Sequence, residues 1–258
     1  MNCRLFLLCT FVPVSFLATS LVAGAAEVVM PNVFRAGESI VFIGDSITHG
    51  GRLNDMNHYL GHGYQAEIAM RYLAYCPELR LQFENRGISG NTSSNLVNRW
   101  KGDAVPCRAG AVGESGVFGW SNPTRTFMPD VLNILVGIND FQKNRVSADG
   151  YERNLRFMVT NSLALNPSMR IVICEPFKLP TPKDESFLDY QKIAARVASD
   201  YDCIFVPFQR LFSEELISIV PREKYWFWDD AHPTYAAHMR MADFWLKTVA
   251  KAFAKDRP

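Results

Sequence analysis

Five short apolar runs divide the chain after residue 38, and each ends at a polar or turn-forming residue. They cover residues 39–43, 79–83, 131–136, 169–174 and 203–206. Apolar runs of this length are typical of parallel strands that are covered on both faces. The pattern therefore predicts a central parallel β-sheet.

Segments with apolar residues at helical spacing lie between these runs, and Asp149 and Thr234 are candidate N-caps for two of them. The segments cover residues 64–75, 94–100, 151–165, 187–198 and 235–253. Strands that alternate with helices favour an α/β sandwich in which helices cover the sheet. Ligands of such sheets bind at the carboxyl ends of the strands, so the residues that follow each strand are the first candidates for a site.

Residues able to activate a serine follow the first strand and precede the last helix. A serine hydroxyl becomes a nucleophile when a histidine removes its proton and a carboxylate orients that histidine. Ser46, His232 and Asp229 provide these three groups. The three-residue spacing lets Asp229 reach the Nδ1 side of the imidazole while the other nitrogen faces Ser46. The same spacing favours Asp229 over the competing carboxylate of Asp230.

An acyl-transfer reaction also needs hydrogen-bond donors fixed where charge develops on the carbonyl oxygen. Three candidates follow predicted strands: the backbone amide of Ser46, the backbone amide of Gly90 and the side-chain amide of Asn139. Glycine at position 90 permits close approach of a ligand. We expect Asp140 to brace the loop that carries Asn139, since Asp commonly bonds to nearby backbone.

Two further residues next to these groups are candidates for substrate binding, Asp45 and Trp228. Trp228 closes an aromatic run that begins at Tyr225. Aromatic side chains serve both burial and recognition, so the run either packs on the sheet edge or forms a platform for a sugar ring or an acyl group.

The four polar segments resemble, in order and spacing, the sequence blocks of the GDSL/SGNH hydrolases. Gly-Asp-Ser alone is a weak signal, but four blocks in order at predicted strand ends or pre-helix turns are specific. The matching blocks are Gly44-Asp45-Ser46, Gly90 within residues 85–91, Gly137-Ile138-Asn139-Asp140 and Asp229-x-x-His232.

This resemblance covers nearly all of residues 27–258. It implies a flavodoxin-like three-layer α/β/α sandwich with a five-stranded parallel sheet. It also implies a serine esterase without a cofactor, acting on small-molecule or polysaccharide esters. The family's substrates include acetylated polysaccharides, lysophospholipids, short acyl esters and thioesters.

One segment departs from the family pattern, an insertion of about residues 104–128 that is rich in glycine and serine. Topology places it at the amino end of the third strand, opposite the predicted site. Long loops in compact domains are usually functional or disordered. We expect an ordered surface excursion that serves as an oligomer contact; the alternative is a loop that folds over an edge and touches substrate.

The first 26 residues predict a cleaved signal peptide. Arg4 precedes an apolar run from Leu5 to about Val22, and small residues follow it at positions 23–26. A retained membrane anchor is the alternative, and Pro13 weakens it. We therefore expect a secreted or periplasmic enzyme with no stable membrane insertion after cleavage.

Charge and histidine spacing argue against nucleic acid and metal ions as binding partners. The formal net charge is +1, from 27 basic and 26 acidic residues, which leaves no electrostatic footprint for nucleic acid. His58 and His62 are four residues apart, but Gly61 and Gly63 argue against a helix there, and no carboxylate cluster completes a metal site. We expect no metal, and we expect His238 on the surface or at an interface of the last helix.

Four cysteines follow the predicted signal peptide, an even number for an oxidising destination. They are Cys76, Cys107, Cys174 and Cys203. Three disulfide pairings are open to them, and free buried thiols are the alternative.

Export, near-zero net charge and aromatic residues near the site favour O-deacetylation of a carbohydrate. A lysophospholipase or thioesterase is the first alternative and requires a wide apolar acyl groove. A non-catalytic glycan-binding domain is the second, and it predicts damage to the chemical residues, of which there is none. A dinucleotide site is excluded because Gly44-Asp45-Ser46 occupies the turn where a Gly-x-Gly-x-x-Gly pattern belongs.

Overall fold

The computed structural model describes residues 30–54, 60–108, 126–142, 145–178, 185–221 and 223–255. The predicted signal peptide (residues 1–26), His58 and residues 109–125 of the predicted insertion lie outside these ranges. Within the ranges, no helix combines the length and the apolar character needed to cross a membrane.

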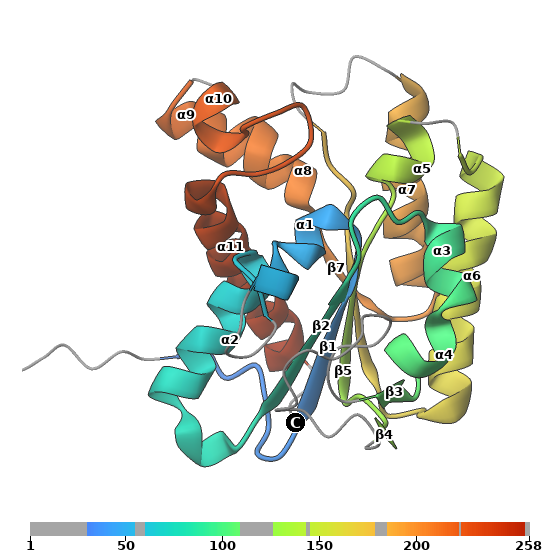
Figure 1. Ribbon diagram of the computed structural model, residues 1–258, viewed down its shortest axis with the longest axis vertical. Helices are drawn as coiled ribbons and strands as arrows, with labels where there is room; N and C mark the ends of the chain where they lie inside the picture. Colours follow the sequence, from blue (N-terminus) through green and yellow to red (C-terminus); the bar gives the residue numbers. More distant parts are fainter. Residues whose placement is uncertain are drawn as a thin grey trace, which may run out of the picture.

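A five-stranded sheet forms the centre of the molecule, in the order β2-β1-β5-β6-β7 (Figure 1). All neighbouring pairs are parallel. The chain turns from β1 to β2 on one side and then crosses to β5 on the other, so the strand order reverses beside β1. The strands are β1 (Ser39–Gly44), β2 (Gln82–Gly87), β5 (Val131–Leu135), β6 (Arg170–Cys174) and β7 (Ile204–Val206).

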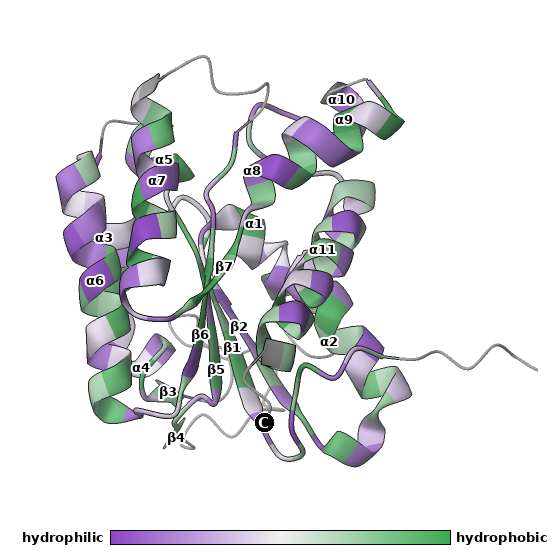
Figure 2. Cartoon of the chain, turned by 180° about the vertical axis from the view of Figure 1, so that it is seen from behind, coloured by the Kyte–Doolittle hydropathy of each residue, from purple (hydrophilic) through white to green (hydrophobic). Residues whose placement is uncertain are grey.

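Helices cover both faces of the sheet, which confirms the predicted three-layer α/β/α fold (Figures 1 and 2). One face carries α2 (Tyr64–Tyr75) and α11 (Tyr235–Lys255), which pack against each other. The other face carries α3 (Ser93–Asn98), α6 (Ala148–Leu165) and α7 (Glu185–Asp200). In Figure 2 the apolar sides of these helices turn toward the strands.

Shorter elements connect these layers. They are α1 (Ser46–His49), η1 (Arg52–Asn54), η2 (Pro77–Leu79), α4 (Trp100–Asp103), α5 (Ile138–Gln142), α8 (Phe208–Arg210), η3 (Leu211–Leu216), α9 (Ile217–Ile219) and α10 (Glu223–Trp226). The sequence pattern had predicted none of the elements between β7 and α11, although α8, η3 and α9 follow one another without a gap.

Two local expectations were wrong. The second strand begins three residues later than the apolar run, because Pro77 starts the 3₁₀ turn η2 and sheet pairing begins where Ser39 meets Gln82. The cap of α6 is Ser147, whose side chain accepts a hydrogen bond from the Gly150 amide, and Asp149 lies inside the helix. Thr234 does cap α11, since its hydroxyl accepts from the amide of Ala237.

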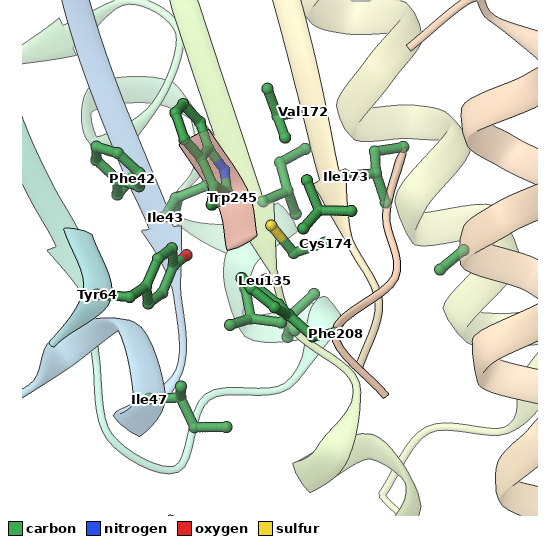
Figure 3. Close-up of a cluster of buried hydrophobic side chains, with 14 of the residues drawn as sticks. Phe42, Ile43, Ile47, Tyr64, Leu135, Val172, Ile173, Cys174, Phe208 and Trp245 are labelled. Carbon is green, nitrogen blue, oxygen red and sulfur yellow. The ribbon is translucent and has the colours of Figure 1, made fainter. Parts of the chain in front are cut away.

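A buried polar chain ties the two helices of one face to the sheet. Trp245 of α11 donates to the side chain of Asn133 in β5 at 2.8 Å, and Asn133 donates to the Tyr64 hydroxyl of α2 at 2.8 Å. All three side chains are fully buried, and Trp245 and Tyr64 lie among the apolar residues of β1, β5 and β6 (Figure 3). A satisfied buried network of this kind specifies one arrangement of the layers.

The base of the predicted insertion lies where topology had placed it. β3 (Cys107–Arg108) pairs antiparallel with β4 (Thr126–Phe127). This pair sits at the amino ends of the strands, at the opposite end of the sheet from α1 (Figure 1). The four cysteines beyond residue 30 are free thiols.

Candidate active site

Ser46 lies directly beyond the carboxyl end of β1, as the first residue of α1. Asp45 caps this short helix, and its carboxylate accepts from the Ile47 amide at 3.0 Å. Asn85 of β2 donates to the carbonyl of Thr48 at 2.8 Å. The turn that presents Ser46 is therefore held by its own cap and by the neighbouring strand.

Gly87, the last residue of β2, allows this turn to sit close to the sheet. A Cβ at position 87 would lie 2.2 Å from the His49 nitrogen and 2.5 Å from the Thr48 carbonyl carbon. Both are backbone atoms of α1, so any side chain would push the helix away. The glycine is therefore required by the position of the serine.

Three groups form one hydrogen-bonded chain at the carboxyl edge of the sheet. His232 Nε2 lies 2.8 Å from Ser46 Oγ, and His232 Nδ1 lies 2.6 Å from Asp229 Oδ2. The other carboxylate oxygen accepts from the amides of Ala231 at 2.8 Å and His232 at 2.6 Å. The structure thus brings together the serine, histidine and aspartate that the sequence had singled out, and it places Asp229 rather than Asp230 against His232.

Electrostatics set the proton positions in this chain. Burial opposes ionisation of Asp229, but the hydrogen bonds from the Ala231 and His232 amides and from the imidazole outweigh it and lower the Asp229 pKa. Because the carboxylate is ionised, His232 Nδ1 donates to it. Nε2 is then free to accept the proton of the Ser46 hydroxyl.

Two backbone hydrogen bonds close the loop that contains Asp229 and His232. Thr234 N donates to the Trp226 carbonyl at 2.8 Å, and Trp228 N donates to the His232 carbonyl at 3.1 Å. The Trp228 indole stacks on the His232 imidazole, with centroids 4.9 Å apart and planes at 19°. The imidazole is therefore oriented by contacts from within nine residues of chain.

The predicted oxyanion donors Gly90 and Asn139 line the same cavity as Ser46. Gly90 has a φ of 78°, a conformation that favours glycine. No described residue accepts a hydrogen bond from the backbone amide of Ser46 or of Gly90. Asn139 Nδ2 donates to the Asn91 carbonyl at 3.1 Å, which leaves the second hydrogen of this amide available.

Asp140 and Arg99 join neighbouring blocks of the site, and the sequence reasoning had missed Arg99. Asp140 accepts from the Ser93 amide at 3.0 Å and from the Ser93 hydroxyl, so it braces α5, which carries Asn139, against the start of α3 through a distant residue rather than through the nearby backbone that we expected. Arg99 is the missed residue. Its guanidinium donates to the Gly44 carbonyl at 3.2 Å and to Asn91 Oδ1 at 2.8 Å, which links the turns before Ser46 and after Gly90.

A cavity of about 960 Å³ opens beside these groups. It is lined by Ser46, Ile47, His49, Gly50, Gly51, His62, Ser89, Gly90, Asn139, Trp228, His232, Pro233, Thr234, Tyr235 and His238. Trp228, which lines the cavity, is 68 % exposed, whereas the preceding Trp226 and Phe227 are buried. The aromatic run thus divides between core packing and the cavity wall.

Asp45 does not face this cavity, which corrects its assignment as a substrate-binding residue. The side chain is 1 % exposed, and burial raises its pKa from 3.8 to about 7. Its cap to Ile47 turns the carboxylate into the protein. Sequence position beside the nucleophile indicated proximity but not direction.

Four of the chain's five histidines line the cavity, whereas the sequence had led us to expect His232 and one of His49, His58 and His62 there. His238, expected on the surface or at an interface of the last helix, is only 7 % exposed. Its burial follows from α11 packing on α2, where His238 Nδ1 accepts from the Tyr64 amide. Among the described residues there is no group of three His, Cys, Asp or Glu able to hold a metal ion.

Comparison with known proteins identifies the family to which this constellation belongs. The model of the GDSL-like lipase/acylhydrolase family matches residues 42–240. The chain belongs to this family. This GDSL hydrolase is a carboxylic ester hydrolase.

Similar proteins include an acetylxylan esterase from Geobacillus stearothermophilus, 30 % identical over 239 residues, which cover 86 % of this chain and 98 % of that one. Its crystal structure has a TM-score of 0.67 at 29 % identity, with 84 % and 96 % of the two chains covered. A putative GDSL-like lipase from Parabacteroides merdae has a TM-score of 0.69 at 29 % identity, over 86 % and 99 %.

Proposed function

We propose that this GDSL hydrolase removes acetyl groups from an O-acetylated carbohydrate, with Ser46 as nucleophile, His232 as base and Asp229 as the orienting carboxylate. The observation that carries the proposal is the chain of hydrogen bonds from Asp229 through His232 to Ser46, at 2.6 and 2.8 Å. Geometry of this kind, rather than sequence position, is what defines a serine triad.

In the first half-reaction, His232 Nε2 takes the proton of Ser46 Oγ as the oxygen attacks the ester carbonyl. The oxyanion that forms accepts hydrogen bonds from the amides of Ser46 and Gly90 and from the Asn139 side chain. His232 then gives its proton to the departing alcohol, and acetyl-Ser46 remains. Asp229 stays ionised throughout and stabilises the imidazolium.

In the second half-reaction, a water molecule takes the place of the alcohol beside His232. His232 removes its proton while the water oxygen attacks the acetyl carbonyl, and the same donors hold the second oxyanion. Collapse releases acetate, and the proton returns to Ser46. No step requires a metal or an organic cofactor.

The cavity lining supports a short acyl group over a long one. Ile47 and Pro233 are its only aliphatic residues among those described, and the remainder are glycine, polar or aromatic residues. A lysophospholipase needs a long apolar groove for its acyl chain. The acetylxylan esterase among the relatives supports acetylated xylan as the first carbohydrate to test.

The test is hydrolysis of p-nitrophenyl esters from acetyl to long acyl, and of acetylated xylo-oligosaccharides, by wild type and Ser46→Ala. We expect the acetyl esters to be preferred and the substitution to reduce kcat/KM by about 10⁴-fold or more. Ser89→Ala, which removes another hydroxyl from the cavity wall, is the matched control and should remain active. A maximum at long acyl chains would favour the lipid alternative, and an active Ser46→Ala enzyme would refute the triad.

We also propose that residues 1–26 direct export and are then removed, which would bring the enzyme to polysaccharide substrates outside the cytoplasm. Mass spectrometry of the exported protein tests this. A mature chain beginning near residue 27 supports it, and an intact N-terminus contradicts it.

A further inference from the structure

The proposed mechanism leaves one deeply buried cavity residue without a task, His238. It lies in the first turns of α11 and contributes to the cavity wall while being only 7 % exposed. Its Nδ1 accepts from the amide of Tyr64 at 3.2 Å. Tyr64 begins α2, and the first amides of a helix have no partner within it. His238 Nδ1 therefore carries no proton.

The protonation state of this imidazole follows from its surroundings. Burial and the nearby His232 lower the His238 pKa to about 4, so the ring is neutral at neutral pH. A neutral ring whose Nδ1 accepts a hydrogen bond has its proton on Nε2. No described residue accepts from this nitrogen, and it is not among the fully buried side-chain atoms without a partner, so it is open to the cavity that His238 lines. The cavity wall thus contains an N–H donor in a fixed tautomer, from which a hydroxyl or ring oxygen bound in the cavity can accept.

The position of His238 indicates which half of an ester it would meet. In the proposed mechanism His232 must reach the departing oxygen, so the alcohol lies on the His232 side of Ser46. His238 belongs to the same stretch of chain as His232, and its pKa responds to the charge of His232. The oxyanion donors Gly90 and Asn139 come instead from the turns that follow β2 and β5.

The neighbouring wall also suits a sugar. Tyr235, one turn before His238, is 72 % exposed and meets the His62 ring edge-on, with centroids 6.1 Å apart. Both residues line the cavity. An aromatic surface beside one or a few placed donors is typical of a site that orients a small polar ligand.

We propose that His238 binds the alcohol half of the substrate, donating from Nε2 to a hydroxyl or ring oxygen of the acetylated sugar. This rests on the proposed function and adds a specificity residue to it. His238 acts in ground-state binding of the sugar and takes no part in proton transfer with Ser46. An ester whose alcohol lacks such oxygens gains nothing from it.

The experiment compares two substitutions on two substrates. His238→Asn retains an acceptor near the Tyr64 amide and removes the Nε2 donor, whereas His238→Gln retains a donor near the Nε2 position. The substrates are an acetylated xylo-oligosaccharide and p-nitrophenyl acetate, whose alcohol has no sugar oxygen. We expect His238→Asn to raise KM for the oligosaccharide about five- to tenfold, the effect of one hydrogen bond. Its kcat/KM for p-nitrophenyl acetate should stay within about twofold of wild type, and His238→Gln should recover part of the oligosaccharide KM.

Equal losses on both substrates in both variants would overturn the proposal and make His238 a structural residue. Unchanged oligosaccharide KM in a folded His238→Asn enzyme would overturn it as well. A wild-type enzyme inert on both esters would instead overturn the proposed function on which the inference rests.

A second measurement keeps the test decisive if both variants unfold. Ser46→Ala protein labelled with ¹⁵N-histidine is titrated with the acetylated xylo-oligosaccharide, and the imidazole resonances are followed by NMR. We expect the Nε2–H signal of the neutral histidine that does not titrate near pH 6 to move as the sugar binds. Saturable binding, seen in other signals, that leaves this resonance in place would refute the proposal.

Discussion

The two halves of the proposed active site are held in different ways. The half of the proposed nucleophile, with Ser46, Gly90 and Asn139, rests on side chains buried in the fold, among them Asn85 and Asp140. The acid–base half is near the surface, where the side chains of Asp229 and His232 are 37 % and 31 % exposed. Long-range packing therefore positions the nucleophile, whereas hydrogen bonds within one loop position its base.

The pKa values of one carboxylate in each half are shifted in opposite directions. Burial raises the Asp45 pKa to about 7, so ionisation of Asp45 destabilises the folded state. Hydrogen bonds to Asp229 outweigh its burial and lower its pKa, so ionisation of Asp229 stabilises the folded state. We expect substitutions in the nucleophile half to reduce stability together with activity, and substitutions in the acid–base half to reduce activity alone.

Removal of the base should have the largest effect. His232→Ala leaves Ser46 without a proton acceptor, and we expect kcat/KM on p-nitrophenyl acetate to fall about 10⁴-fold or more. The thermal midpoint should change by only about 2 °C, because the side chain is partly exposed and its loop closes through backbone bonds. His62→Ala, which removes an exposed cavity histidine outside the triad, is the control. A large drop in thermal midpoint for His232→Ala would contradict the expectation that substitutions in the acid–base half reduce activity alone.

A methyl group at Gly87 should damage stability and activity together. The new Cβ would meet backbone atoms of α1 at 2.2 and 2.5 Å, so the turn carrying Ser46 must move. We expect Gly87→Ala to cost about 1–3 kcal/mol of unfolding free energy and about 10²-fold in kcat. Denaturant unfolding and kinetics measure the two.

Gly37→Ala is the matched control for that substitution. Gly37 has a φ of 81°, but a Cβ added there would meet no atom within 4 Å, so backbone strain is its only penalty. We expect a loss of about 1 kcal/mol in stability and unchanged kcat. A Gly87→Ala enzyme that behaves like Gly37→Ala would contradict the close packing of β2 against α1.

The buried carboxylate of Asp45 should make stability depend on pH. Its pKa is 3.8 in the unfolded chain and about 7 in the folded protein, so between these values the unfolded chain binds fewer protons. The contribution of Asp45 to stability therefore falls as pH rises from about 4 to 7. Asp45→Asn cannot ionise, and we expect its thermal midpoint to decline less than wild type between pH 5 and pH 8. An identical decline in both proteins would assign the titration to other groups.

Loss of the stacked indole should have the smallest effect. Trp228 contacts one face of the His232 imidazole and helps to orient it. We expect Trp228→Ala to lower kcat about three- to tenfold on p-nitrophenyl acetate, since such ring pairs contribute about 0.5–1.5 kcal/mol. Trp228→Phe, which keeps an aromatic face, should stay near wild type. Equal losses in the two variants would indicate that the ring contact does not matter.

Much of this architecture could be predicted from local patterns. Apolar runs indicated five strands because strands covered on both faces exclude polar residues, and the polar segments after them marked the carboxyl edge. The same reasoning misplaced β2, since the preceding turn begins at Pro77 and strand pairing, not hydrophobicity, decides where the strand starts. It also left open whether His238 lies on the surface or at an interface, because the Tyr64 amide that fixes it comes from 174 residues away.

The sequence by itself determined the chemistry of the acid–base loop. The bonds that join Asp229 to His232 span three residues, so residue type and spacing suffice to predict them. Only the tertiary structure decided that His232 Nε2 lies 2.8 Å from Ser46 Oγ, across 186 residues of chain. It also decided that Asp45 turns inward and that His238 opens onto the cavity. The physical reason is that burial and long-range contacts depend on which distant segments pack together, and no local pattern contains that information.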